Sequence, residues 1–434
     1  MNRRRLVNTA GLGGLGAILV VPAGAQAEDF AVTNLADEVG MGSVPGSLRE
    51  AVIDANLTAG PDRIIFDSKL TGTISLDDAS VYLYGSSVDI IGPGARRVTI
   101  DGHGDSRIFT VQDTTGSATI SGLTMTRGAS NGDGGAIRAD DADLTIANSA
   151  VTDSDATGGA TDNGGGIYVL GDSGLPEDLV ISNSTISGNT AEDEGGGIYT
   201  SEIDMALRSS TVSGNRAQAG AGIYLESSED TDEIQNSTVT RNVATSSAGG
   251  IQRGPAELRG SIVAGNTAPL GPDISSAFAF SAAFSLVGDT SDATVDDQGG
   301  NLLNVDPKLK PLKNNGGPTD THAFKKSKAK NKLPKGQTPK SDQRGAPRKG
   351  KGDIGAYELV KCEGVIVNRV GTGKKDKLKG TNKKDGILGL GGNDKLVGKK
   401  GRDGLCGGKG KDKLKGGPGN DKLDGGPGKD KEVQ

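Results

Sequence analysis

Aliphatic residues recur through the middle of the chain in a nine-residue phrase that is repeated six times. Each copy has an aliphatic side chain at its first position and another apolar one five or six places later. The copies begin at Ile120, Ile146, Ile181, Leu207, Ile234 and Leu258. Their starts lie 24 to 35 residues apart, which is the period expected when each copy belongs to one turn of a solenoid.

A second phrase, in which small residues precede an isoleucine, alternates with the first. Its isoleucines are Ile137, Ile167, Ile198, Ile223 and Ile251. A short strand with one inward aliphatic cannot bury that side chain alone, but it can when it stacks on its counterpart from the next turn. The pattern therefore predicts a parallel β-helix with two strands per turn in register. The fixed order of the two phrases argues against the alternative, a β-sandwich with evenly spaced strands.

Polar residues recur at the predicted bends with the same period. Asparagine occupies the third position of three copies and the ninth position of four, namely Asn148, Asn183, Asn236 and Asn189, Asn215, Asn242, Asn266. We expect these amides to form structural ladders rather than to bind a ligand. Tyr168, Tyr199 and Tyr224 share one position of the second phrase and are expected to stack, with a sugar-contacting strip as the alternative.

Short β-prone runs before the first phrase are interpreted as the earliest turns of a solenoid over residues 61–277. Residues 30–33 suggest a strand, and Ser47 with Glu50 forms a capping box that opens a helix ending near Asn56. Residues 46–51, GSLREA, resemble the CSLREA domain of secreted bacterial β-helix proteins, with Gly46 in place of the cysteine. The resemblance implies an N-terminal cap over residues 28–60.

Residues 278–360 lack the phrases and are rich in lysine. Their motifs NGGPT (315–319), THA (321–323), DQRG (342–345) and DIGAYE (353–358) resemble the ending of the choice-of-anchor Q domain of surface β-helix proteins. A lysine-rich insertion replaces the apolar segment that this family has between the motifs. Together the two resemblances imply a right-handed parallel β-helix.

From residue 371 the chain divides without a gap into seven nonapeptides. The sixth place is always aspartate: Asp376, Asp385, Asp394, Asp403, Asp412, Asp421 and Asp430. The eighth place is aliphatic in six copies. Because Ca²⁺ takes six to eight oxygen ligands, a turn that offers carbonyls and one carboxylate must combine with a neighbouring turn. The spacing predicts six-residue turns and three-residue strands in a calcium-binding parallel β-roll over residues 361–434.

This pattern, GGxGxDxUx, resembles the hemolysin-type (RTX) calcium-binding repeat. Lys374 and Lys383 replace the glycine of the fourth place in the first two copies, where we expect a strained turn and a repelled ion. Glu432 replaces the last aliphatic. The middle aspartates are therefore expected to be the better ligands. Without calcium we expect a disordered tail.

Residues 1–27 have the basic head, apolar stretch and small-x-small site of an export signal. We expect cleavage before Glu28, export by the Sec or twin-arginine route, and an extracellular or cell-surface location. No later segment is long and apolar enough to span a membrane. In an exported chain the two cysteines, Cys362 and Cys406, are expected to form a disulfide.

Charge is unevenly distributed along the chain. Residues 28–307 carry 41 acidic and 13 basic side chains, whereas residues 308–351 carry 2 and 14. Solubility and attraction between the parts account for this division, and binding of an anionic wall or extracellular polysaccharide is the alternative. No specific nucleic-acid partner is expected.

The sequence contains no recognisable catalytic constellation. His103 and His322 are interpreted as turn residues, and Arg49 and Glu50 as the start of a helix. We therefore favour a secreted, non-enzymatic, calcium-binding solenoid with a surface, adhesion or matrix role. The alternative is a polysaccharide lyase or glycoside hydrolase of the pectate-lyase-like β-helix type, because right-handed β-helices often carry those activities. The absence of tryptophan argues against an aromatic sugar-binding groove.

Overall fold

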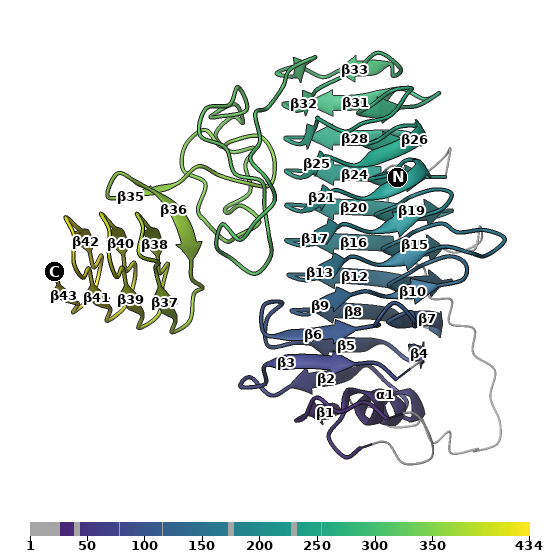
Figure 1. The fold of residues 1–434 in the computed structure, drawn as a ribbon, viewed down its shortest axis with the longest axis horizontal. Helices are drawn as coiled ribbons and strands as arrows, with labels where there is room; N and C mark the ends of the chain where they lie inside the picture. The colour runs from purple at the N-terminus through teal and green to yellow at the C-terminus, as the bar shows by residue number, and fades with distance from the viewer. Residues whose placement is uncertain are drawn as a thin grey trace, which may run out of the picture.

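The computed structural model describes residues 27–38, 44–77, 79–114, 116–171, 178–226, 232–252 and 254–434. These residues form a tall stack of parallel strands, a connecting region and a smaller stack at the C-terminus (Figure 1). The export signal predicted for residues 1–27 lies outside the described residues, apart from Ala27. In the described ranges, no helix has the length and apolar character needed to cross a membrane.

Three long parallel sheets and one short sheet form the tall stack, which we call the solenoid. Sheet A contains β1 (Asp29–Val32), β2 (Asp62–Phe66), β5 (Val88–Ile91), β8 (Ser117–Ser121), β12 (Asp143–Ala147), β16 (Asp178–Ser182), β20 (Asp204–Arg208), β24 (Asp232–Gln235), β28 (Ala256–Arg259), β31 (Phe280–Ala283) and β33 (Val295–Asp297). Sheet B contains β3 (Gly72–Ser75), β6 (Val98–Asp101), β9 (Thr124–Thr126), β13 (Ala150–Thr152), β17 (Thr185–Ser187), β21 (Thr211–Ser213), β25 (Thr238–Thr240), β29 (Ile262–Val263), β32 (Leu286–Val287) and β34 (Leu302–Leu303). Sheet C contains β4 (Val81–Gly85), β7 (Phe109–Thr114), β11 (Ile137–Asp140), β15 (Ile167–Leu170), β19 (Ile198–Ser201), β23 (Ile223–Leu225), β27 (Ile251–Gln252) and β30 (Ile274–Ser275). Sheet D contains β10 (Ala129–Ser130), β14 (Asp155–Ala156), β18 (Thr190–Ala191), β22 (Arg216–Ala219) and β26 (Val243–Ser247).

The strand register places the repeated aliphatics directly above one another. Ile120 pairs with Ile146 in sheet A, and the column continues through the first residue of every later phrase copy to Leu258. In sheet C, the equivalent column runs from Phe109 through Ile137 to Ile274. Both columns are buried in one core, so the predicted parallel β-helix is confirmed. The expected two strands per turn are wrong, because each turn contributes strands to three long sheets and, in the middle of the stack, to the short sheet D.

The sheets extend beyond the predicted limits of the solenoid. β1 pairs with β2, and β31 to β34 continue sheets A and B as far as Leu303. Phe280, Ala282 and Val287 still point into the core, but the asparagine that marks the ninth position of the phrase is absent. The end predicted at residue 277 is therefore too early, because the inward apolar positions continue after the polar signature stops.

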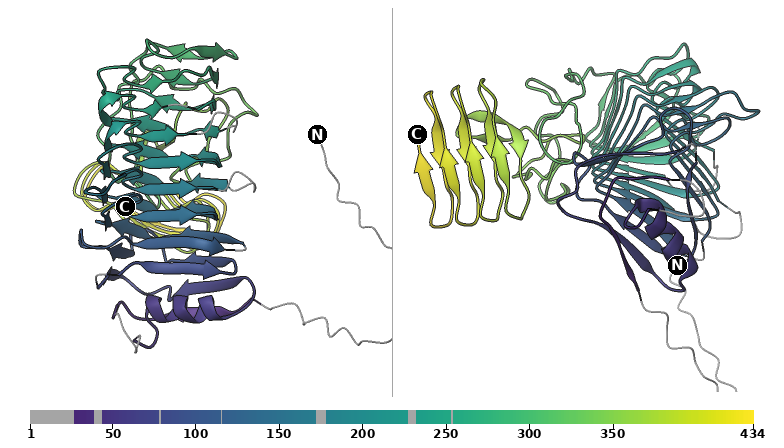
Figure 2. Two further views of the ribbon diagram at one scale, coloured as in Figure 1. Left: turned by 90° about the vertical axis from the view of Figure 1, so that its right-hand side faces the viewer. Right: turned by 60° about the horizontal axis from the view of Figure 1, so that its bottom comes forward.

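Helix α1 (Leu48–Leu57) covers the N-terminal end of the solenoid (Figure 2). The backbone N–H of Glu50 donates to the Ser47 hydroxyl (3.1 Å), and the Glu50 carboxylate accepts from the N–H of Gly46 (2.5 Å). The helix buries Leu48, Ala51, Val52 and Ala55, so one of its faces closes the end of the core.

Two side chains of α1 also bind β4, the strand at the N-terminal edge of sheet C. The Asn56 amide donates to the carbonyl of Tyr82 (2.8 Å) and accepts from the N–H of Tyr84 (3.2 Å). The Arg49 guanidinium donates to the carbonyl of Ser80 (3.1 Å). These bonds occupy backbone groups that would otherwise form an open strand edge, the feature through which β-proteins associate.

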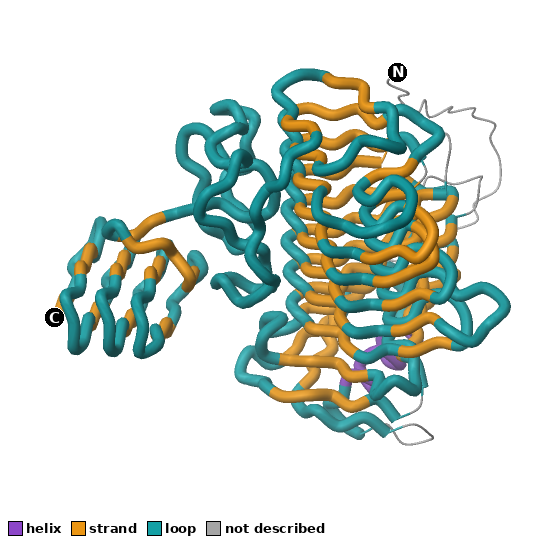
Figure 3. The backbone as a smooth tube through the Cα atoms, turned by 45° about the horizontal axis from the view of Figure 1, so that its top comes forward, coloured by secondary structure: helices purple, strands orange, loops and turns teal. Residues whose placement is uncertain are grey.

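Residues 304–360, the connecting region, consist almost entirely of loops (Figure 3). Buried polar side chains form a bonded network there, beside small apolar clusters such as that of Phe324 and Tyr357. The fully buried Arg344 forms an ion pair with Asp342 (2.8 Å) and donates to three backbone carbonyls. Arg348 forms a second buried ion pair with Glu358 (2.9 Å). The DQRG and DIGAYE motifs therefore supply the internal bonds of a segment that lacks sheets.

The connecting region packs against the outer face of sheet B. The Gln343 amide donates to the Thr185 hydroxyl (2.9 Å) and accepts from that of Thr211 (2.6 Å). The N–H of Ala356 donates to the hydroxyl of Thr238 (3.0 Å). These threonines occupy the same position of successive strands, so the solenoid presents a ladder of hydroxyls to which the connecting region binds.

The C-terminal stack, which we call the β-roll, extends away from the solenoid on the far side of the connecting region (Figure 2). Sheet E contains β35 (Lys361–Cys362), β36 (Val365–Val370), β38 (Gly386–Leu388), β40 (Gly404–Cys406) and β42 (Lys422–Asp424). Sheet F contains β37 (Lys377–Lys379), β39 (Lys395–Val397), β41 (Lys413–Lys415) and β43 (Lys431–Val433). β35 and β36 form an antiparallel hairpin, and the predicted disulfide joins Cys362 to Cys406.

Candidate calcium-binding centre

Each nonapeptide forms one six-residue turn and one three-residue strand, as the spacing predicts. Odd-numbered repeats contribute their strands to sheet F and even-numbered repeats to sheet E. The aliphatics of the eighth place pack together between the two sheets: Leu378, Ile387, Leu396, Leu405, Leu414 and Leu423. This narrow core fixes the turns in two rows along opposite edges of the roll.

The seven aspartates lie in these rows, with Asp376, Asp394, Asp412 and Asp430 on one edge and Asp385, Asp403 and Asp421 on the other. One carboxylate oxygen has the same role in five of them. Asp394 Oδ1 accepts from the backbone N–H of Asp376 (2.8 Å), eighteen residues earlier. The same 2.8 Å bond recurs for Asp403, Asp412, Asp421 and Asp430. Each carboxylate is thereby held in the space between two neighbouring turns.

The second carboxylate oxygen has no protein partner in the central repeats. Oδ2 of Asp394, Asp403, Asp412 and Asp421 is buried and accepts no hydrogen bond. Burying an anionic oxygen without a partner is unfavourable unless a cation or a donor compensates for the lost water. Four such atoms in a regular array therefore indicate positions for a cation, and the chemistry of the residues fits the calcium predicted from the sequence.

The electrostatics of these aspartates agree with that interpretation. Burial, with a smaller effect of the neighbouring carboxylates of Asp412 and Asp376, raises the pKa of Asp394 to about 6, against the opposing effect of the N–H bond from Asp376. Burial likewise raises the pKa of Asp403. Like charges stack along each row, so the protein alone does not stabilise the ionised form of these groups. A divalent cation between turns would remove that repulsion.

Backbone carbonyls are the other hard oxygens close to these turns. Turns two repeats apart approach so closely that a Cβ on Gly410 would lie 1.7 Å from the carbonyl oxygen of Gly392. A Cβ on Gly419 would lie 1.6 Å from that of Gly401. The described residues contain no group of three or more His, Cys, Asp or Glu side chains that could hold a metal ion. Calcium in the roll would thus take one or two carboxylates and complete its shell with turn carbonyls, which is a common calcium coordination.

The aspartates of the first two repeats are less open to a cation than the central ones, as expected, but the cause is not the predicted one. Neither Lys374 nor Lys383 has a positive φ, so the predicted strain at the fourth place is not present. Instead, threonine follows the first glycine of each repeat. The hydroxyl and N–H of Thr372 donate to Asp376 Oδ2 (2.9 and 2.6 Å), and those of Thr381 donate to Asp385 Oδ2 (2.8 and 2.6 Å). Protein donors therefore occupy the oxygen that stays unpartnered in the next four repeats.

Two family models match the chain. Residues 79–297, about half of its length, match the model of a right handed beta helix region. The chain belongs to the right-handed β-helix family. Residues 370–405 and 407–431 of this β-helix protein match the RTX calcium-binding nonapeptide repeat, so the tail is a calcium-binding β-roll.

A search of curated proteins found no match to this β-helix protein. Among solved structures, the PL6 family alginate lyase AlyGC is similar at 12% identity, with a TM-score of 0.23. The similarity covers 92% of this chain and 71% of the lyase chain. A likeness at that level says nothing about the activity of this β-helix protein.

The asparagines of the β-helix split into two groups. Those of the ninth position form the predicted ladder: Asn189 donates to Asn215 (3.0 Å), and the bonds continue through Asn242 and Asn266 to Asp273. Those of the third position, Asn148, Asn183 and Asn236, have φ of 50° or 51° and make no amide ladder, so that prediction is wrong. They occupy left-handed turns, which asparagine tolerates better than most residues.

The tyrosine ladder is present. The rings of Tyr168 and Tyr199 stack with centroids 5.0 Å apart, and those of Tyr199 and Tyr224 are 5.4 Å apart. All three rings are buried, and both faces of the central ring, Tyr199, are covered by its neighbours. Of the two histidines, His103 is exposed in its turn. His322 is buried between the carbonyl of Lys310 and the hydroxyl of Ser213.

Sequence reasoning missed a second ladder, made of serines at the fourth position of the phrase. The N–H of Ser149 donates to the hydroxyl of Ser184 (3.1 Å), and the same bond is repeated turn by turn to Ser285. The periodic serine was visible in the sequence. It was overlooked because isolated serines are common in turns.

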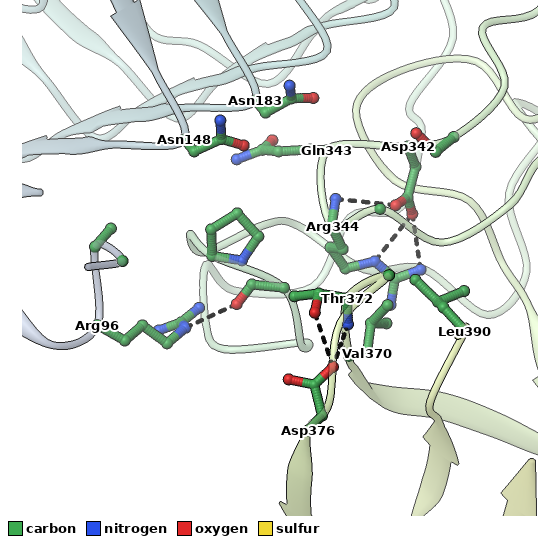
Figure 4. A pocket seen from close by; sticks show the side chains of 18 of the residues that line it. Arg96, Asn148, Asn183, Asp342, Gln343, Arg344, Val370, Thr372, Asp376 and Leu390 are labelled. Atoms are coloured by element: carbon green, nitrogen blue, oxygen red, sulfur yellow. Dashed lines mark hydrogen bonds and ion pairs between the residues drawn. The ribbon is translucent and has the colours of Figure 1, made fainter. Parts of the chain in front are cut away.

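A cleft of about 600 Å³ lies where the β-helix, connecting region and β-roll meet. Figure 4 shows Asn148 and Asn183 of the β-helix on one side and Thr372 with Asp376 of the first repeat on the other. Arg96 contacts the connecting region at this site through the carbonyl of Gly317 (3.0 Å) and Asp320 (2.8 Å). The first repeat is therefore adjacent to the β-helix, and the aspartates of the central repeats lie farther out along the roll.

Proposed function

We propose that this protein is an exported calcium-binding solenoid that acts at the cell surface or in the extracellular matrix without catalysing a reaction. The observation that carries the proposal is the array of buried, unpartnered carboxylate oxygens at Asp394, Asp403, Asp412 and Asp421. Extracellular calcium modules commonly bind in the range of about 10⁻⁴ to 10⁻³ M, a concentration found outside cells. The β-roll would then fold after export, when the tail meets calcium.

The N-terminal end of the solenoid supports export with cleavage before Glu28. β1 begins at Asp29, directly after the predicted cleavage site. The backbone nitrogen of Glu28 donates to the carboxylate of the buried Asp62 (3.1 Å), which also accepts from the hydroxyl of Thr58. Cleavage at that point would create an α-ammonium group beside Asp62. N-terminal sequencing of the exported protein tests this directly.

We also assign residues 28–60 to a CSLREA-like cap and the connecting region to a choice-of-anchor Q-like fold. α1 and its bonds to β4 support the first assignment. The second is supported by the burial of Asp342, Arg344, Asp353 and Glu358, all within the quoted motifs, in one network. Both assignments favour a surface protein, since the resembling families are secreted.

Two faces of the solenoid favour a binding or structural role over polysaccharide cleavage. The connecting region covers the outer face of sheet B at Thr185, Thr211 and Thr238. On sheet C, Tyr168, Tyr199 and Tyr224 stack on one another and do not present open ring faces to a sugar. The lyase or hydrolase alternative is tested by incubation with pectate, alginate and glycosaminoglycans in millimolar calcium, where turnover would overturn the non-enzymatic role.

The proposal that calcium binds and folds the β-roll is tested by circular dichroism of the full-length protein during a calcium titration. We expect a gain of β signal in the wild type and its loss in D394N/D403N/D412N/D421N, which removes the unpartnered oxygens' charge. The matched control is D89N/D105N/D155N/D204N, which neutralises four exposed aspartates of the solenoid. An equal calcium response in both variants would place the metal elsewhere and overturn the proposal.

A further inference from the structure

The outer face of sheet F carries a straight column of lysines. Strand register pairs Lys377 with Lys395, Lys395 with Lys413, and Lys413 with Lys431. A shorter second column adds Lys379 and Lys415 at the ninth place of alternate strands. All six side chains are exposed, and among the described residues none forms an ion pair. We call these six residues the lysine face.

The equivalent face of sheet E shows that the lysines are not a by-product of the repeat. There the seventh place is Gly386 in β38 and Gly404 in β40. A Cβ on either would lie 2.4 Å from a backbone carbonyl of the β35–β36 hairpin, at Ile366 and Cys362 respectively. In β42 the seventh place is again an exposed lysine, Lys422. Lysine therefore occupies the seventh place wherever the roll leaves that place open.

A column of like charges at strand spacing is electrostatically unfavourable. Neighbouring strands lie about 4.8 Å apart, so the four lysines of the long column span roughly 14 Å. The distance of about 4.8 Å between neighbouring strands is shorter than the screening length of about 8 Å at physiological ionic strength, so neighbouring ammonium groups repel one another. Like charges directly opposite on adjacent strands destabilise a sheet. An anionic partner on the lysine face would relieve this repulsion.

We propose that the lysine face binds a linear polysaccharide carrying one carboxylate on each sugar, with the polymer axis along the stacking direction of the β-roll. Each ammonium group sits on a flexible four-carbon stem, so the column can pair with carboxylates spread along an extended polymer without matching their spacing. A carboxylate on every sugar gives the high charge density that offsets the repulsion within the column. Figure 1 shows that β37 lies nearest the connecting region and β43 farthest from it, so the column leads outward along the roll. The site rests on the calcium-folded β-roll of the proposed function, because only the folded roll aligns the lysines.

The composition of the roll favours a carboxylated polysaccharide over a nucleic acid. Residues 371–434 contain no aromatic side chain, whereas single-stranded nucleic acids are bound largely by stacking bases on aromatic rings. Their only arginine is Arg402, and arginine is the residue suited to two-pronged phosphate recognition. Lysine is a compact point charge that suits a single carboxylate per sugar. A flat, straight column also matches an extended polymer better than a helical duplex.

The test measures binding of the full-length protein in millimolar calcium to polymannuronate, which has one carboxylate per sugar. Hyaluronan, with one carboxylate per two sugars, tests the dependence on carboxylate density, and dextran is the neutral control. The variant K377Q/K395Q/K413Q/K431Q removes the long column. Its matched control, K325Q/K326Q/K328Q/K335Q, removes four exposed lysines of the connecting region.

We expect the column variant to weaken polymannuronate binding roughly tenfold or more and to lower the slope of log Kd against log salt by about two or more, because fewer counterions are released. The control variant should change the Kd less than twofold. Hyaluronan should bind more weakly than polymannuronate at equal carboxylate concentration. Calcium-induced circular dichroism of each variant is recorded separately, so a roll that fails to fold is distinguished from a folded roll that fails to bind.

Lysine footprinting of the wild type avoids any effect of substitution on folding. Polymannuronate should protect Lys377, Lys395, Lys413 and Lys431 from acetylation and leave Lys325 and Lys335 unchanged. Equal losses in both quadruple variants, or uniform protection, would reduce the lysine face to general basicity and overturn the proposal. So would tighter column-dependent binding to duplex DNA, or salt-sensitive self-association that the column variant abolishes without polymer.

Discussion

In the first two tail repeats, a threonine hydroxyl and its N–H bind the carboxylate oxygen that has no partner in the next four. Thr372 and Thr381 therefore act as built-in substitutes for a cation at Asp376 and Asp385. These repeats lie beside the connecting region, where a self-sufficient turn can hold the start of the roll before calcium arrives. The number of bound ions then depends on the residue at the second place as well as on the aspartate.

Restoring glycine in the second repeat should create a calcium position there. In T381G/K383G, Asp385 Oδ2 loses the hydroxyl donor of Thr381. Glycine at the second and fourth places also frees the turn to adopt the form of the central repeats, in which Oδ2 has no protein partner. We expect the calcium stoichiometry, measured by isothermal titration calorimetry, to rise by about one. K384G, which removes a lysine of the same turn and keeps Thr381, is the control. An unchanged stoichiometry in T381G/K383G would show that the threonine does not decide occupancy.

His322 makes the attachment of the connecting region sensitive to pH. Burial lowers the pKa of its imidazole to about 4, outweighing the bond to the carbonyl of Lys310. An unfolded histidine titrates near 6.5, so the unfolded state takes up a proton that the native state does not. Stability is therefore complete above about pH 6.5 and is lost as the pH falls toward 4, by up to about 3 kcal/mol.

Native-state hydrogen exchange measures this loss at the amides of Lys310 and Thr321, which bond within the connecting region. We expect their exchange to accelerate below pH 6.5, after correction for intrinsic rates, in the wild type. H322Q keeps a hydrogen-bonding side chain but does not titrate, so its profile should be flatter over the same range. Parallel profiles would assign the pH dependence to other groups.

At the scale of strands and turns, ladders of one residue type hold successive turns together. Asn215 donates to Asn242 and accepts from Asn189, in each case within 3.0 Å and fully buried. Removing one member leaves buried groups on both neighbours without partners, which destabilises far more than the bond itself is worth. The ladder also ends in Asp273, whose pKa burial raises to about 6.

We expect N215A to lower the free energy of unfolding by about 2–4 kcal/mol, measured by urea denaturation in saturating calcium. N183G is the matched control, because Asn183 belongs to the same phrase but occupies a left-handed turn that glycine adopts readily. Its stability should change by less than about 1 kcal/mol. Similar losses in both variants would mean that the amide ladder has no special role.

These ladders show which elements can be predicted from the sequence. A hydrophobic period identifies the strands, and the register of Ile120 on Ile146 follows from it. The direction of a bend residue does not follow, because Asn183 and Asn189 share one phrase yet only Asn189 points inward to bond its neighbours. For the same reason the polar signature does not predict the end of the solenoid: Phe280 and Val287 continue the core without it.

At the scale of the whole molecule, the connecting region determines how the two stacks meet, and its structure was the least predictable. Gln343 bonds to Thr185, 158 residues away, and Arg344 is buried by carbonyls from three separate segments. No period in the sequence encodes such contacts. By contrast, the seven aspartates and their rows were predictable because a strict nine-residue period fixes each position, although the threonine donors at Asp376 and Asp385 were not foreseen.

The disulfide couples the calcium-dependent roll to the rest of the molecule. Cys362 lies in β35, beside the connecting region, and Cys406 lies in β40, the strand of the fourth repeat. The bond therefore keeps the middle of the roll near its start when calcium is absent, and closing a loop of this size typically stabilises the folded state by about 2–4 kcal/mol. Without the disulfide, more of the free energy of folding of the roll must come from calcium binding.

We expect C362S/C406S to require a higher calcium concentration at the midpoint of the circular dichroism titration. At intermediate calcium, trypsin should cleave this variant at the tail lysines, whereas the wild type resists. The solenoid, whose core is separate from that of the roll, should resist trypsin equally in both proteins. Identical midpoints would show that the roll folds without help from its attachment, and calcium alone would then determine when the tail is ordered.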